Sequence, residues 1–184
     1  MSYKRWLLLA VFLFGIGVAW GLATPVDEPS LLAEDIDALG ELADFLAPLP
    51  HVSFFIFVFL KNVSALLISF AFSPVFYLVP VIALILNGGI IGFVSALVLQ
   101  EKSLGYLLAG LLPHGIFELP ALIIGEAAAF SFGTAVILAL FKKERGNLVL
   151  PNLRQNLRYL AIAIILLLPA AIIETYLTPL LLGQ

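Results

Sequence analysis

The sequence predicts an all-α membrane protein with about five transmembrane helices, a re-entrant half-helix and an extracytoplasmic amphipathic helix. Of the 184 residues, 62% are apolar and only 11% are charged, whereas an average soluble domain carries roughly 25% charged residues. The apolar residues also gather in runs long enough to cross a hydrocarbon core of about 30 Å. We expect one domain over residues 1–184, and the absence of cysteine excludes disulfides and thiolate metal sites.

The N-terminal part holds one apolar run and one acidic segment. The first span is expected over 6–24, after the basic pair Lys4 and Arg5. A cleaved signal peptide is the alternative, but this run exceeds a typical h-region of about 7–15 residues. Residues 25–50 then carry seven acidic residues and no Lys or Arg. Apolar residues recur there at spacings of four and three, which predicts an amphipathic helix over 30–47 that packs on the protein's own helices.

The remaining spans follow from the other apolar runs. Two are expected over 51–72 and 74–99, and the last over 159–182. The run over 104–141 is too long for one straight span. Pro113 and Pro120 interrupt it, and Pro120 disfavours helical geometry at Leu119. We therefore expect a break after Glu118, with a re-entrant segment over 104–120 and a full span over 121–141.

Basic residues predict the orientation in the cell membrane, because cytoplasmic loops are enriched in Lys and Arg. Lys4 and Arg5 place the N-terminus inside. Five basic residues between Lys142 and Arg158 place that loop inside as well. The turn before residue 104 lies outside, so residues 104–141 must cross the membrane an odd number of times to reach this loop. One full span plus one re-entrant turn satisfies that condition, and the C-terminus then lies outside.

Small residues recur four positions apart, as at Gly17 and Gly21, at Gly88 and Gly92, and at Gly125 and Ala129. This spacing lets helices approach closely in lipid. It indicates a tightly packed bundle or an oligomer, and we expect a homodimer that uses the face of Gly88 and Gly92.

Ionisable residues inside apolar runs mark the candidate site, since a charge at the bilayer centre costs at least about 2.5–3.5 kcal/mol. His114 and Glu118 share a helix face at i and i+4. Glu174 lies about 22 Å along the last span from its cytoplasmic end, which is the half of the membrane that the re-entrant segment enters. We therefore expect these three side chains to meet.

The chemistry of this cluster has three interpretations. His114, Glu118 and Glu174 are suitable ligands for zinc or another divalent metal ion. A buried His–Glu pair that fixes the helix break, or a path for protons or solutes, are the alternatives. For Glu126 we expect a buried protonated acid or a pair with Lys61.

Two asparagines inside the apolar runs are further buried polar candidates. Interhelical hydrogen bonds are expected for Asn62 and Asn87. Because both lie near the middle of their spans, they are also placed to join the cluster.

The stretch from Pro113 to Ala121, P-H-G-I-F-E-L-P-A, resembles the signature of the stage II sporulation protein M (SpoIIM) family. Asn62 after an aromatic-rich run, Asn87-Gly88 before Gly92, and Ile173-Glu174 before Thr178-Pro179 resemble its other recurring positions, in the same order. The resemblance covers roughly 6–179 and implies a five-span integral membrane protein. It also implies a role like that of the namesake, which in spore formers anchors two cell-wall-degrading enzymes at the engulfing septum. Glu126 departs from the pattern, where a small or apolar residue is expected.

Three classes of function are compatible with these observations. The first is a non-catalytic scaffold, not an enzyme, that anchors or recruits membrane or cell-wall-associated proteins. The second is an ion or small-solute transporter or channel that uses the His114–Glu118–Glu174 cluster. The third is a metal-dependent intramembrane hydrolase, although the HExxH motif is absent. The expected partners are the lipid bilayer, a second copy of the chain and envelope proteins, with no nucleic acid.

Overall fold

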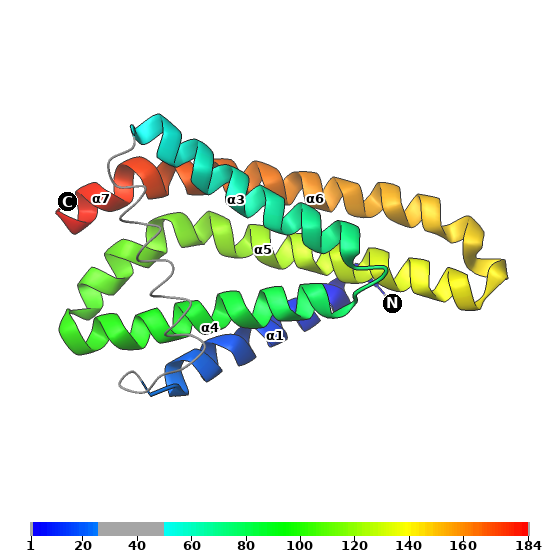
Figure 1. Ribbon diagram of the computed structural model, residues 1–184, viewed down its shortest axis with the longest axis horizontal. Helices are drawn as coiled ribbons and strands as arrows, with labels where there is room; N and C mark the ends of the chain where they lie inside the picture. The colour runs from blue at the N-terminus through cyan, green and yellow to red at the C-terminus, as the bar shows by residue number, and fades with distance from the viewer. Residues whose placement is uncertain (1, 26–49, 184) are drawn as a thin grey trace.

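The computed structural model describes residues 2–25 and 50–183, and every element in them is helical (Figure 1). The long helices are α1 (Tyr3–Ala23), α3 (His51–Phe72), α4 (Leu78–Glu101), α5 (Leu104–Phe141) and α6 (Val149–Ile172). The short elements are a 3₁₀ helix η1 (Lys143–Leu148), a π-helix η2 (Ile173–Leu177) and α7 (Thr178–Leu182). The all-α class is confirmed, and five helical segments are long and apolar enough to cross a membrane. The amphipathic helix expected over 30–47 lies outside the described residues.

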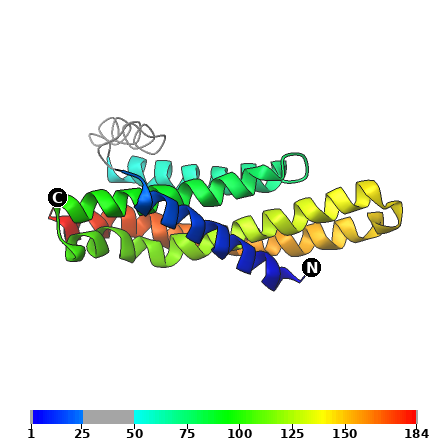
Figure 2. The same ribbon diagram turned by 90° about the horizontal axis from the view of Figure 1, so that it is seen from below.

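The helices run side by side along the long axis of the molecule (Figures 1 and 2). The N-terminal end holds Tyr3, the turn between α3 and α4, and η1. The opposite end, here called the C-terminal end, holds Ala23, His51, the turn between α4 and α5, and Leu182. The hairpin of α5 and α6 extends beyond the other helices at the N-terminal end.

Helix α5 differs from the sequence prediction because it is continuous over 38 residues and contains both Pro113 and Pro120. The expected break after Glu118 does not form, and the helix bends instead in the part nearer Leu104 (Figure 1). Each proline removes one backbone hydrogen bond and crowds the carbonyl four residues earlier, which kinks a helix. Contacts with α3, α4 and α6 hold the turns on either side helical. The expected re-entrant segment over 104–120 is therefore the oblique first part of α5.

The last long helix also begins earlier than its apolar run predicts. It starts at Val149 rather than near residue 159. Its additional turns direct Asn156 toward α5. The Asn156 amide donates to Ser131 Oγ of α5 at 3.2 Å and to Asn152 Oδ1 one turn earlier in α6 at 2.8 Å. Polar contacts between α5 and α6 thus stabilise turns of α6 that precede its apolar run.

The core consists of two clusters, and α5 belongs to both. One cluster joins α3, α5 and α6 and includes Leu66, Ala128 and Leu167. The other joins α1, α4 and α5 and includes Trp6 and Phe130. Helix α5 therefore lies between the other helices and connects the two halves of the bundle.

Helices α1 and α4 run in the same direction and pack through glycines (Figure 1). Gly17 and Gly21 face the α4 backbone, whereas Gly88 and Gly92 face the α1 backbone. These glycines are thus buried inside one chain. The expectation that Gly88 and Gly92 form a dimer face is corrected accordingly, because α1 already occupies that face. Self-association itself stays a prediction.

We expect Gly21→Ala to lower the stability of the protein by about 1–3 kcal/mol, the usual cost of overpacking. A Cβ at Gly21 would lie 2.7 Å from the Phe93 backbone nitrogen, so α1 and α4 would have to separate. Gly15→Ala in the same helix is the matched control, because a Cβ there has no neighbour within 4 Å. Unfolding by denaturant in micelles measures both variants, and equal losses would contradict the glycine-mediated packing.

Candidate functional site

The candidate site lies on three elements near the bend of α5. Helix α5 supplies His114 and Glu118, and Asn62 comes from the middle of α3. Glu174 lies in the π-helix η2, a rare irregularity that is frequent at functional sites. The site thus combines a bent helix and a helix of altered pitch.

Glu118 is the centre of the site. Its Oε1 accepts a hydrogen bond from Asn62 Nδ2 at 3.2 Å. Its Oε2 lies 3.9 Å from His114 Nε2, and the two side chains retain 28% and 15% of their exposed surface, respectively. The structure therefore joins His114 and Glu118 on one helix face, as their spacing predicts, and adds Asn62 from a neighbouring helix.

Glu174 lies beside this group but does not bond to it. Its carboxyl is within electrostatic range of the Glu118 carboxyl and the Lys61 ammonium. Within residues 2–25 and 50–183, no hydrogen bond or ion pair joins Glu174 to His114 or Glu118. The Lys61 side chain is exposed.

The described side chains do not assemble the three ligands expected for a metal ion. No group of three His, Cys, Asp or Glu residues is arranged for a metal within the part of the chain that the structure describes. Zinc sites in proteins use at least three protein ligands, and His114 and Glu118 supply two. The predicted site for zinc or another divalent ion stays a prediction.

The two asparagines behave differently. Asn62 forms the expected interhelical hydrogen bond with Glu118, whereas Asn87 Nδ2 donates to the Ala83 carbonyl of its own helix at 2.7 Å and is exposed. Both side chains and Glu118 line one small pocket of about 40 Å³. That volume is large enough for on the order of one water molecule, and the pocket lies among α3, α4, α5 and α6.

Glu126 is paired with a residue that the sequence analysis missed. Its side chain is 1% exposed, and it accepts a hydrogen bond from the Ser69 hydroxyl. The pair with Lys61 therefore does not form. Ser69 lies seven residues after Asn62, and Glu126 lies eight after Glu118, so both pairs repeat on the same faces of α3 and α5. This repeat of polar residues in both apolar runs is the sequence signal that could have identified Ser69 as the partner of Glu126.

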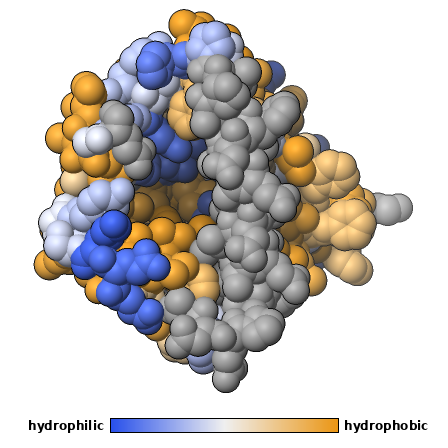
Figure 3. All heavy atoms as spheres, turned by 60° about the vertical axis from the view of Figure 1, so that its left-hand side comes forward, coloured by the Kyte–Doolittle hydropathy of each residue, from blue (hydrophilic) through white to orange (hydrophobic). Residues whose placement is uncertain are grey.

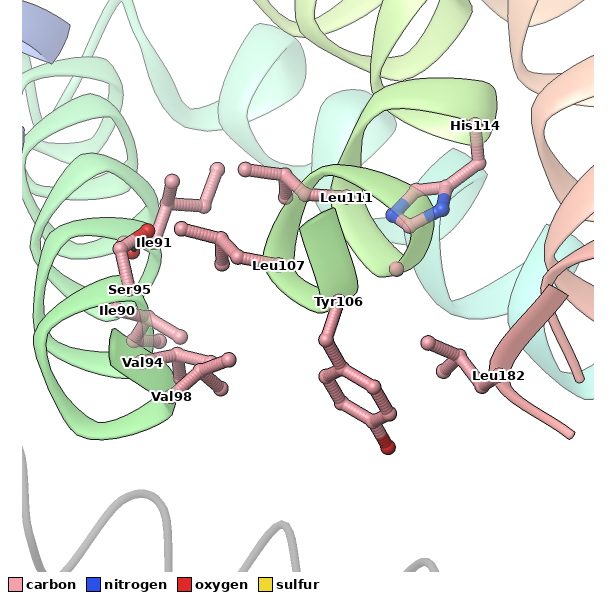
Figure 4. Close-up of a pocket in the computed structure, with 11 residues that line it drawn as sticks. Ile90, Ile91, Val94, Ser95, Val98, Tyr106, Leu107, Leu111, His114 and Leu182 are labelled. Atoms are coloured by element: carbon pink, nitrogen blue, oxygen red, sulfur yellow. Dashed lines mark hydrogen bonds between the residues drawn. The ribbon is translucent and has the colours of Figure 1, made fainter. Parts of the chain in front are cut away.

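A larger pocket of about 330 Å³ lies at the C-terminal end. Figure 4 shows Ile91 and Val94 of α4 facing Leu107 of α5 across it, with Leu182 at another side. His114 lines the same pocket, and its Nδ1 is buried without a hydrogen-bond partner among the described residues. Figure 3 shows that this end of the molecule is hollowed, with hydrophobic residues on the floor and hydrophilic residues on part of the rim.

Comparison with known proteins places these residues in a family. The family model described as Stage II sporulation protein M matches residues 8–179, a range that contains Asn62, His114, Glu118 and Glu174. A protein of Methanocaldococcus jannaschii, described as uncharacterized, is 30% identical over 175 residues, which cover 94% of this chain and 93% of that protein. No solved structure matches the chain.

We expect the Asn62–Glu118 hydrogen bond to give a coupling of roughly 0.5–1.5 kcal/mol in a double-mutant cycle of alanine variants, as measured for polar pairs between membrane helices. Glu118→Gln should cost less than Glu118→Ala, because its amide oxygen still accepts from Asn62. The control is a cycle of Asn87→Ala with Glu118→Ala, which should show little coupling. Coupling as large for Asn87 as for Asn62 would contradict this geometry.

Proposed function

Since the chain belongs to the stage II sporulation protein M family, we propose that it is a non-catalytic membrane scaffold that recruits membrane or envelope proteins. The observation that carries this proposal is the pocket of about 330 Å³ at the C-terminal end. It supports a binding role because a preformed hollow of this size and apolar lining accepts side chains of a partner segment.

The surroundings of the pocket favour a helical partner. Apolar side chains of two neighbouring helices line it, as Val94 of α4 and Leu107 and Leu111 of α5 do. A partner helix that inserts an apolar side chain between α4 and α5 would cover this lining, which is the usual mode of helix recognition by an apolar groove. We infer that the partner is a membrane-anchored protein whose own helix ends at this depth.

The distribution of charge supports an extracytoplasmic position for this pocket. Tyr3 stacks on Tyr159 with ring centroids 3.7 Å apart, so Lys4 and Arg158 belong to the same end of the bundle. By the positive-inside rule, we infer that this N-terminal end is cytoplasmic. The pocket then faces the side where cell-wall-associated proteins lie, in keeping with the role that the family resemblance implies in spore formers.

The two alternative functions have weaker support. An ion or small-solute transporter would use the polar cluster around Glu118, but the pocket that Glu118 lines measures about 40 Å³, far less than the apolar one. A metal-dependent intramembrane hydrolase would need a third ligand beside His114 and Glu118. Both stay predictions, and the scaffold is the function that we propose.

The inferred orientation predicts the outcome of reporter fusions. A reporter fused after Lys142 should be active in the cytoplasm, and one fused after Gln184 should be active outside, because five crossings separate the two termini. An alkaline phosphatase and green fluorescent protein pair measures both positions. An outside signal at Lys142 would contradict the cytoplasmic assignment of the basic end.

The proposed binding site predicts position-dependent crosslinking in living cells. A photoreactive amino acid in place of Leu107, in the pocket, should yield a crosslinked protein band. The same residue in place of Ile165, which is 67% exposed on α6 and faces lipid in the inferred topology, is the control and should yield none. Mass spectrometry identifies the partner.

A variant that fills the pocket tests whether a partner side chain binds there, because it should prevent that binding. Leu111→Trp should remove most of the crosslinked product at Leu107, because the indole occupies the space of the partner side chain. Leu168→Trp, an equal change at an exposed α6 position, should not. Identical protein bands at Leu107 and Ile165, or no effect of Leu111→Trp, would contradict binding in the pocket.

A further inference from the structure

A second candidate site lies at the N-terminal end, in a groove that runs from the face of α6 into the gap between α6, α1 and α5. Two depressions of about 550 and 510 Å³ meet there, and Tyr159 and Ile162 line both. This groove is on the opposite end of the molecule from the pocket of the proposed function, and its role is independent of that proposal.

The residues around the groove carry only positive charge. Arg154 and Arg158 line the first depression, and Lys4 lines the second. All three side chains are exposed, and none of the described residues that line either depression is acidic. Arg154 and Arg158 are four residues apart on α6 and therefore share one helix face. Their guanidinium groups are suited to bind phosphate oxygens through paired hydrogen bonds.

Aromatic contacts fix the middle of the groove. Tyr3 stacks on Tyr159 at 3.7 Å, and the Tyr3 hydroxyl donates to the Ile124 carbonyl at 2.9 Å. Gln155 Nε2 lies 3.5 Å from the Tyr159 hydroxyl, which remains able to donate its own proton to an acceptor. Tyrosines of this kind are enriched at membrane–water interfaces, where one edge of the ring is apolar and the other wet.

The groove spans the boundary between polar and apolar surface. The turns of α6 before Tyr159 carry Asn152, Arg154, Gln155 and Arg158, whereas the sequence from Tyr159 to Ala170 has no charged residue. The apolar part of the groove, farther from the N-terminal end, is lined by Leu7, Ile124 and Ile162. A ligand that fits must therefore carry negative charge at one end and a hydrocarbon chain at the other.

We propose that this groove binds an anionic phospholipid from the bilayer. Arg154, Arg158 and the Tyr159 hydroxyl hold the phosphate, Lys4 adds attraction from α1, and one acyl chain lies along Leu7 and Ile162. Basic pockets between membrane helices on the cytoplasmic side bind such head groups by the same combination of forces. An acidic peptide would satisfy the charges but would leave the apolar floor uncovered.

The test measures lipid retention by native mass spectrometry of the detergent-solubilised full chain. The probes are phosphatidylglycerol and phosphatidylcholine with identical acyl chains. We expect the wild type to prefer phosphatidylglycerol. Arg154→Gln combined with Arg158→Gln should weaken phosphatidylglycerol binding about 30-fold, if each Arg contributes as a basic residue at an anionic surface does. It should weaken phosphatidylcholine less, because the choline cation of that lipid offsets the attraction of its phosphate to the arginines.

The control removes two charges elsewhere. Lys102→Gln combined with Lys142→Gln has the same net charge as the arginine double variant but leaves both depressions intact, and it should bind phosphatidylglycerol like the wild type. Ile162→Trp keeps every charge and narrows the apolar floor, so it should weaken both lipids.

Three results would overturn the proposal. The first is equal retention of the two lipids by the wild type. The second is an equal loss in the two double variants, which would indicate diffuse attraction by surface charge. The third is binding of an acidic peptide that displaces phosphatidylglycerol and is insensitive to Ile162→Trp, which would identify a protein-binding site.

Discussion

The arrangement of the bundle depends on the close approach of α5 to all the other long helices that the structure describes. Helix α5 permits this because it presents a run of small residues where they meet: Ala127, Ala128 and Ala129 are fully buried, and Gly125 faces Leu66 of α3. Lipid offers little hydrophobic drive for helices to associate, so dispersion contacts between closely spaced backbones must stabilise the bundle. The glycines of α1 and α4 likewise let the backbones of these two helices approach closely.

Close approach in turn allows polar groups to be satisfied at membrane depth. Helices α3 and α5 contribute two pairs, Asn62 with Glu118 and Ser69 with Glu126, and Tyr77 in the turn after α3 pairs with Thr134 of α5. The register is nearly constant, at separations of 56, 57 and 57 residues. An unpaired polar group buried away from water costs several kcal/mol, so each pair disfavours any slippage of the two helices. The candidate site is thus one member of a repeated series, distinguished by His114 and by the nearby Glu174.

The bend of α5 gives the two ends of the molecule different surfaces. Before the bend, the helix runs obliquely away from the end of α4 (Figure 1), and the apolar pocket lies between these two helices and Leu182. After the bend, α5 runs straight beside α6 and projects past the other helices. One end is therefore hollow and apolar, which suits a partner segment. The other is basic and aromatic, which suits anionic lipid.

The sequence alone determined the helical class, the apolar segments that can cross a membrane, the family, and the shared helix face of His114 and Glu118, because hydropathy, periodicity and short motifs are local properties. It did not determine that α5 continues through Pro120, that α1 covers Gly88 and Gly92, or that Ser69 rather than Lys61 pairs with Glu126. Those outcomes depend on which helix faces meet across more than fifty residues of chain. Only tertiary packing decides them, since it selects one partner among several that are chemically suitable.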